Sequence, residues 1–190
     1  ARQEQALLTR GFLRTDGGGP DTPFTASMLA ANFERIALFD EYADAGGRLV
    51  SGPVPSALRR WEGPVRMRLE FGPAVPDAQR NRDIRDVSAY AARLARLTRH
   101  PVSMLAPQAA RDVANFHILV VTEDERRAAA PLLRQLVPGI DDGSVRLITD
   151  LPLSVSCVVL AFSRGASSVF SSAVAVIRAE LPDLTRLSCY

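Results

Sequence analysis

The sequence predicts an α+β domain, a mixed β-sheet with helices packed on it, from two observations. Short apolar runs typical of strands alternate along the chain with longer segments in which apolar residues recur every three or four positions, as in amphipathic helices. With 190 residues, 47% of them hydrophobic, the chain is long enough for one domain with a substantial core. We expect an N-terminal arm over residues 1–24 and a single α+β domain over residues 25–190.

The charge and hydropathy of the chain exclude several classes of protein. The formal net charge of +2 is too small to predict a nucleic-acid partner, although all 23 basic residues are arginine. No run approaches the roughly 18 apolar residues that a transmembrane helix needs. The first ten residues also lack the apolar core of a signal peptide, so we expect a soluble chain or one that has already been processed.

The first element expected in the domain is a helix that begins at its N-cap, Thr25, and runs to about Tyr42. A turn at Gly46-Gly47 should lead into a short strand at residues 48–50, and a single helical turn is expected over residues 56–61. The stripe of the first helix that we expect to be buried comprises Met28, Leu29, Phe33, Ile36 and Phe39.

Residues 65–71 show the clearest strand pattern, because apolar and charged residues alternate along them. One face of this strand should therefore be exposed. Its arginines and those just before it form a local basic surface that could hold an anionic partner or protect a sheet edge, and we favour edge protection. These candidate partner-binding residues are Arg59, Arg60, Arg66 and Arg68.

The middle of the chain predicts the longest helix and a buried strand. The helix should run from Pro76 to about Arg99, with charged residues such as Asp83 on its outer side. The strand follows at residues 115–121. His117 lies within it, and a histidine inside an apolar strand is typically a hydrogen-bonded core residue.

A capping box, with Thr122 as N-cap and Glu125 three residues later, opens a further helix that should extend to about Val137. Pro131 either kinks this helix or lies in the first turn of a second one. The short apolar run at residues 145–148 is interpreted as a strand.

The last third of the chain should organise the fold. Residues 154–164 are apolar on both faces, which indicates a central strand covered on two sides. A second strand is expected at residues 172–179, with a helix as the alternative. Leu181-Pro182-Asp183 then has the features of a helix start, because proline and an early aspartate suit the first turn.

A search for chemistry finds no catalytic, cofactor-binding or metal-binding residues. The only two histidines, His100 and His117, have no further His or Cys at metal-ligand spacing. The sequence from Gly165 to Val169 lacks the second glycine of a serine nucleophile elbow. Cys157 lies within a predicted strand, where a thiol is typically buried and unreactive.

Four stretches resemble a proteobacterial family of exported proteins of unknown function (domain-of-unknown-function family 2927), several of whose members are regarded as lipoproteins. They are TPFTASMLAANFERIALFDEY, LRRWEGPVRMRLEFGP, ANFHILVV and AVAVIRAELPDLTRLSCY. The resemblance covers most of residues 10–190 and implies export to the periplasm. The order of elements is also similar to that of zincin metallopeptidases, although the chain ends at Tyr190, within the final helix.

Export implies an oxidising compartment, in which Cys157 and Cys189 would form a disulfide; two buried thiols are the alternative. Two functions remain. The first is a non-catalytic, zincin-like domain that binds a protein partner in a cell-envelope or membrane assembly, with membrane association through a lipid anchor or that partner. The second is the front part of a metallopeptidase-like hydrolase whose catalytic helix lies beyond Tyr190. We favour the first, because no predicted site meets the geometric requirements of catalysis.

Overall fold

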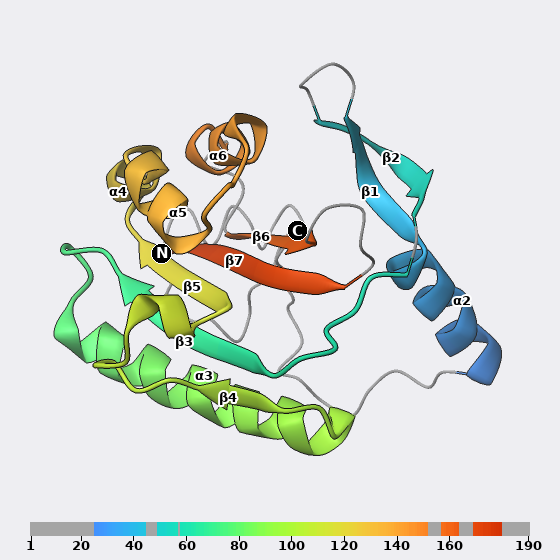
Figure 1. The fold of residues 1–190 in the computed structure, drawn as a ribbon, viewed down its shortest axis with the longest axis horizontal. Helices are drawn as coiled ribbons and strands as arrows, with labels where there is room; N and C mark the ends of the chain where they lie inside the picture. Colours follow the sequence, from blue (N-terminus) through green and yellow to red (C-terminus); the bar gives the residue numbers. More distant parts are fainter. Residues whose placement is uncertain (1–24, 45–48, 57, 152–156, 164–168, 180–190) are drawn as a thin grey trace, which may run out of the picture.

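The computed structural model describes residues 25–44, 49–56, 58–151, 157–163 and 169–179, and the statements below concern these residues. A five-stranded mixed sheet with helices on both faces confirms the predicted α+β class (Figure 1). The arm predicted at residues 1–24 and the helix predicted from Leu181 lie outside the described residues. The strands of the sheet are β3 (Val65–Phe71), β4 (Val102–Met104), β5 (Phe116–Val121), β6 (Cys157–Ser163) and β7 (Phe170–Arg178).

The order of the strands across the sheet is β4-β3-β5-β7-β6, and all neighbours are parallel except β6 and β7. The strand reading of residues 172–179 is therefore confirmed, as β7 pairs on both of its edges. The prediction of a central strand at residues 154–164 is wrong in position, because β6 lies at the edge of the sheet. Only the start of this strand, at Cys157 and Val158, is buried on both faces, and Val159 is 39% exposed.

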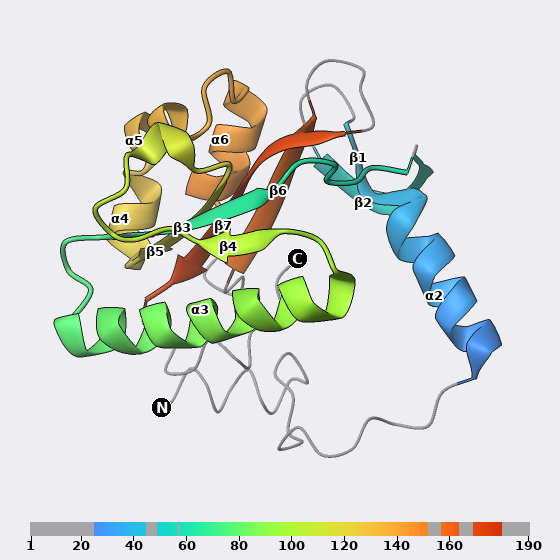
Figure 2. The same cartoon turned by 60° about the horizontal axis from the view of Figure 1, so that its bottom comes forward.

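One face of the sheet is covered by the long helix α3 (Asp77–Thr98), which connects β3 to β4 and lies along the sheet (Figure 2). The core on this side contains Met67 of β3, Ile118 of β5 and Ala175 of β7. Asp83 was expected on the outer side of α3 but is buried, with Arg82 as its ion-pair partner at 3.7 Å. The prediction assumed that a charged residue of an amphipathic helix lies on its exposed side.

Three short helices, α4 (Glu123–Arg127), α5 (Ala130–Leu136) and α6 (Asp142–Thr149), cover the other face (Figure 1). The predicted capping box is present, and Pro131 lies in the first turn of a second helix rather than in a kink. The strand predicted at residues 145–148 is wrong, because these residues belong to α6. Val145 and Ile148 are three positions apart, which suits one face of a helix, and both are buried.

The charged side chain of Arg126 connects helices α4 and α6 of this layer through hydrogen bonds. It is only 2% exposed and donates to both carboxylate oxygens of Glu123, at 3.0 and 2.6 Å. It also donates to the carbonyl oxygens of Ile148 and, at 2.7 Å, of Leu151, which follows α6. A single buried arginine thus joins the start of α4 to the end of α6.

A helix and a hairpin lie to one side of the sheet: α2 (Ala26–Ala37), β1 (Phe39–Asp44) and β2 (Leu49–Pro55) (Figure 1). Thr25 is the N-cap of α2, as predicted, and accepts from the backbone N–H of Met28. The helix ends at Ala37 rather than near Tyr42, since the following residues pair as β1 with β2. The strand predicted at residues 48–50 extends to Pro55, and residues 56 and 58–61 contain no helical turn.

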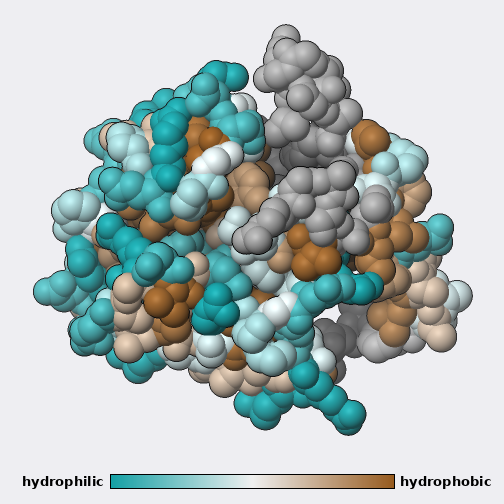
Figure 3. All heavy atoms as spheres, in the orientation of Figure 1, coloured by the Kyte–Doolittle hydropathy of each residue, from teal (hydrophilic) through white to brown (hydrophobic). Residues whose placement is uncertain are grey.

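The apolar stripe of α2 is not buried, contrary to the prediction. No residue of the helix is buried, and four large apolar side chains are at least half exposed: Met28 at 52%, Leu29 at 51%, Phe33 at 63% and Ile36 at 79%. The amphipathic pattern is present, but the described residues provide no surface that covers it. Figure 3 shows the apolar spheres that gather over α2.

Candidate functional site

The face of β3 opposite α3 carries a group of charged side chains, here called the Glu70 cluster: Arg68, Glu70, Arg111 and His117. Arg68 and Glu70 are two positions apart on β3 and therefore share a face, and His117 is the register partner of Arg68 on β5. Arg68 donates from Nε to Glu70 Oε1 at 2.7 Å, and Arg111 donates from Nε to Oε2 at 3.2 Å. The Glu70 side chain is only 6% exposed.

The environment of Glu70 strongly favours its ionised form. Burial is the largest influence and raises its pKa, but His117, Arg68 and Arg111 together outweigh burial and lower the pKa from 4.5 to about 2. His117 Nδ1 lies 3.7 Å from Glu70 Oε1, which is beyond hydrogen-bond distance, so we ascribe the lowered pKa of Glu70 chiefly to Arg68 and Arg111. This buried nitrogen has no hydrogen-bond partner in the described part of the chain. The expectation that His117 is a core residue is confirmed, but the expected hydrogen bond is absent at Nδ1.

The arginines of β3 hold the connection between β4 and β5 against the sheet. Arg66 Nε donates to the carbonyl oxygen of Val113 at 2.6 Å, and Arg68 Nη1 donates to that of Ala109. The amide of Asn115 completes the attachment, accepting from the backbone N–H of Arg66 at 2.7 Å and donating to Pro64. β3 pairs with β4 through residues 65–67 and with β5 on its other side, and both arginines bond to the β4–β5 connection, so the interpretation that they protect a sheet edge is wrong.

The predicted basic surface is divided by the fold into two parts. Arg66 and Arg68 donate hydrogen bonds to other groups of the protein, whereas Arg59 and Arg60 are exposed in the segment before β3. Arg60 pairs with Glu62 at 2.6 Å, and both side chains are more than half exposed. Binding of an anionic partner by these four residues stays a prediction.

The carboxyl ends of β3 and β5, where many α/β folds hold ligands, are filled by Glu125. This carboxylate accepts from the backbone N–H of Thr122 and from that of Ala74, both at 2.8 Å. A Cβ atom on Gly72 would lie 2.0 Å from Glu125 Oε2, so a larger residue there would displace this carboxylate from its present position. The capping glutamate thus connects the start of α4 to the segment that follows β3.

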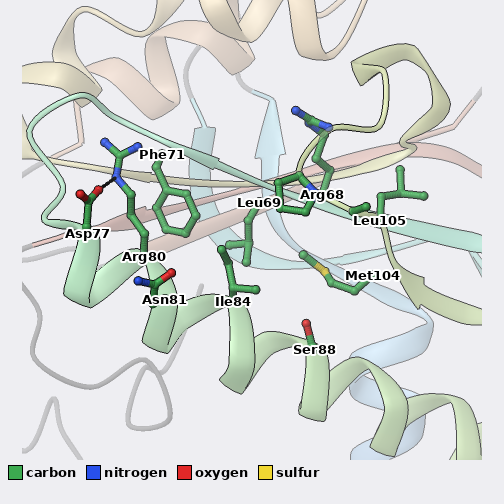
Figure 4. A pocket seen from close by; sticks show the side chains of 12 residues that line it. Arg68, Leu69, Phe71, Asp77, Arg80, Asn81, Ile84, Ser88, Met104 and Leu105 are labelled. Atoms are coloured by element: carbon green, nitrogen blue, oxygen red, sulfur yellow. Dashed lines mark ion pairs between the residues drawn. The ribbon is translucent and has the colours of Figure 1, made fainter.

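A groove of about 640 Å³, here called the β3 groove, lies between α3 and the second half of β3 (Figure 4). Leu69 and Phe71 of β3 and Ile84 of α3 point into it, while the Arg68 guanidinium points away from α3. Arg80 lies beside the ring of Phe71, 5.7 Å from its centre, and pairs with Asp77 at 3.8 Å. The groove is further lined by Asn81, Ser88, Met104, Leu105, Ala106 and Pro107.

Neither location has the composition of a catalytic centre. A carboxyl with a pKa near 2 is too weak a base to accept a proton efficiently at neutral pH, and Glu70 is enclosed by its arginine partners. Ser88, in the β3 groove, has no histidine among the residues that line the groove with it. Among the described residues, no group of three or more His, Cys, Asp and Glu side chains could hold a metal ion.

Sequence reasoning identified Arg66, Arg68 and His117 but missed their partners Glu70, Arg111 and Asn115. One signal was available: opposite charges two positions apart on a strand, as in Arg68 and Glu70, lie on one face and can pair. The other contacts join residues more than 40 positions apart, such as Glu70 and Arg111. No local pattern predicts such a pairing.

The structure describes only one of the two predicted disulfide partners. Cys157 is the first residue of β6 and is 2% exposed, on the face of the sheet covered by α3. It was expected in the middle of a central strand and lies instead at the start of an edge strand. Cys189 lies outside the described residues, so the bridge stays a prediction.

The comparisons with known proteins identify a family without an assigned activity. Among the residues that the structure describes, no helix is both long enough and apolar enough to cross a membrane. Neither the search of curated proteins nor the search of solved structures gave a match. One family model matches residues 26–190, nearly the whole domain expected from the sequence. The chain therefore belongs to the family described as a protein of unknown function (DUF2927).

Proposed function

We propose that this protein is a non-catalytic, partner-binding domain of a cell-envelope or membrane assembly, and that it binds its partner through α2. The observation that carries the proposal is the exposed apolar stripe of this helix. Leu29, Phe33 and Ile36 follow one another at spacings of four and three residues, the arrangement by which a helix inserts into an apolar groove. Met28 adds a fourth side chain on the same side.

The exposure of these side chains is unfavourable in water and favourable in a complex. Complete burial of a fully exposed large apolar side chain contributes roughly 1.5–3 kcal/mol. These four are 51–79% exposed, so each can contribute about half of that or more, and together they supply a substantial part of the free energy of a specific complex. Phe33 and Ile36 are the most exposed, at 63% and 79%, and have the most area to bury. We expect these two to contribute most of the affinity.

The charge of α2 favours a protein groove over a lipid surface. Helices that lie in a membrane interface carry lysine and arginine on their polar face. The polar face of α2 has one basic residue, Arg35, beside the acidic Glu34. Electrostatic attraction to anionic lipids would therefore be weak, and the partner that fits α2 is an apolar groove on an envelope protein.

Export, a periplasmic location and zincin-like element order are part of the same proposal. Resemblance to exported family members supports export and the disulfide between Cys157 and Cys189. The succession of β3, the long α3, β4, β5, short helices, β6 and β7 retains part of the proposed zincin-like order, without the strand expected at residues 145–148. Attachment to the membrane by a lipid anchor or through the partner would place α2 beside envelope proteins.

Photocrosslinking in the cells that make the protein tests this function. A benzophenone amino acid at Phe33 should give one discrete protein adduct, which mass spectrometry identifies, and the same group at the exposed Arg85 of α3 should not. Ile36→Ser should abolish the adduct while leaving the free energy of unfolding unchanged within about 0.5 kcal/mol, since the side chain of Ile36 is 79% exposed. Equal adducts from both positions, adducts to lipid, or an adduct of two identical chains would refute the proposal.

A further inference from the structure

The edge of β3 beyond the end of β4 has backbone groups without partners. β4 pairs only with residues 65–67 of β3, and the last backbone bond across this edge runs from Leu105 N to Met67 O at 2.8 Å. The chain then turns away, with Ala109 N bonded to Ala106 O. The second half of β3 therefore continues past the end of its neighbour.

Leu69 and Phe71 direct their backbone N–H and C=O groups to this open edge. Groups of alternate residues in a strand face the same side, and Val65 and Met67 already bond toward β4. In the described part of the chain, no donor or acceptor pairs with the backbone of Leu69 or Phe71 on this side. These two residues form a short, unpaired template for another strand.

The β3 groove lies along this same open edge, between the template and α3. The helix has 22 residues and spans about 33 Å, whereas the three residues of β4 span about 10 Å. The helix thus covers a length of sheet that β4 does not fill. A volume of about 640 Å³ lies within the range of roughly 300–1,000 Å³ typical of ligand sites.

From this geometry we propose that the β3 groove binds an extended peptide segment of a partner protein, which adds to the sheet as a strand beside Leu69 and Phe71. The free N–H and C=O groups of Leu69 and Phe71 match the backbone of an extended peptide, which presents complementary groups at the same spacing. Successive side chains of the bound segment point alternately toward α3 and away from it.

The lining of the groove defines the segment that fits. Side chains directed at α3 meet Leu69, Phe71, Ile84 and Met104, so they should be apolar. The charged residues on the rim, Arg80 and Asp77, pair with each other, so the site requires no net charge on the peptide. The expected ligand is a neutral segment of about five residues in which apolar and polar residues alternate. This site is separate from α2, and it adds a second mode of binding to the proposed function.

The test uses an acetylated pentapeptide of alternating valine and threonine as the probe, with backbone amide NMR on the protein. Binding should shift the amide signals of Leu69 and Phe71 and slow their hydrogen exchange. Two isomers of the peptide, one N-methylated at its second and fourth residues and the other at its third and fifth, provide the matched pair. The isomer that loses the donors facing β3 should bind about thirtyfold more weakly, the worth of two strand hydrogen bonds, and the other should bind like the parent.

A variant pair on α3 tests the location. Ser88→Trp should fill the groove and weaken binding by at least about tenfold, whereas Arg85→Trp, also on α3 but outside the groove, should leave it unchanged. Ile36→Ser should not affect the peptide, which separates this site from α2. Unshifted Leu69 and Phe71 amides at millimolar peptide, equal binding of the two isomers, or equal binding by the two α3 variants would overturn the inference.

Discussion

Replacing Glu70 with glutamine should lower the free energy of unfolding by about 3 kcal/mol at neutral pH. Glutamine keeps the size of the side chain but removes the charge to which Arg68 and Arg111 donate. The difference between a pKa of 4.5 and one of about 2 corresponds to about 3 kcal/mol of interaction that only the ionised form has. Loss of one partner of a buried ion pair has effects of the same size.

The pH dependence follows from the direction of this shift. A carboxyl whose pKa is lowered by folding stabilises the native state fully above its ordinary pKa, near 4.5, and loses that contribution as the pH falls toward about 2. The wild-type protein should therefore lose stability over this interval more steeply than Glu70→Gln. The difference between the two proteins should be constant from pH 7 to about pH 5 and should approach zero near pH 2.

Urea unfolding at a series of pH values measures this difference. The single tryptophan, Trp61, is a suitable probe because it packs between Phe116 and Phe170, at ring-centre distances of 6.4 and 5.8 Å. Glu62→Gln is the matched control, since its exposed pair with Arg60 should contribute less than about 1 kcal/mol. A loss below about 1 kcal/mol for Glu70→Gln at pH 7, or a difference that does not shrink on acidification, would refute the reasoning.

Two further predictions concern the helical layer and the cysteines. Arg126→Ala should lower the free energy of unfolding in urea by about 3–5 kcal/mol, because Glu123 and two carbonyl oxygens lose a buried donor. Arg127, whose side chain is 53% exposed, is the control, and Arg127→Ala should lower this free energy by less than about 1 kcal/mol. Equal losses would contradict the role assigned to Arg126. Non-reducing mass spectrometry should show a bridge between Cys157 and Cys189, and the described residues contain no free cysteine. Reduction should cost roughly 3–4 kcal/mol, and two alkylatable thiols without reductant would exclude the bridge.

The sequence by itself determined the elements whose signals are local. The alternation in residues 65–71 predicted β3, the spacing of three and four predicted α3, and Thr122 with Glu125 predicted the start of α4. Each of these signals depends on residues within one or two turns, or along one strand, so no distant contact is needed to create it. The α+β class follows from the same patterns.

Only the tertiary structure decided the neighbours of each strand and the surroundings of each charged side chain. The apolar run that includes Cys157 predicted a strand but not its place in the sheet, because the place of a strand depends on which strands pair with it. Arg66 and Arg68 carry the same pattern whether they face water or the segment around Val113. The carbonyl groups to which they donate, those of Val113 and Ala109, lie more than 40 residues away, and contacts over such separations depend on the order of the strands.

The same distinction between sequence and tertiary structure applies to the two proposed binding surfaces. The sequence determined that α2 has an apolar stripe, but its exposure depends on what packs beside it, and an amphipathic pattern is identical for a core helix and for a helix that binds a partner. The template at Leu69 and Phe71 exists because β4 ends after three residues while β3 continues. The length of one strand against another is a property of the pairing between them, so the tertiary structure alone determines where an open edge lies.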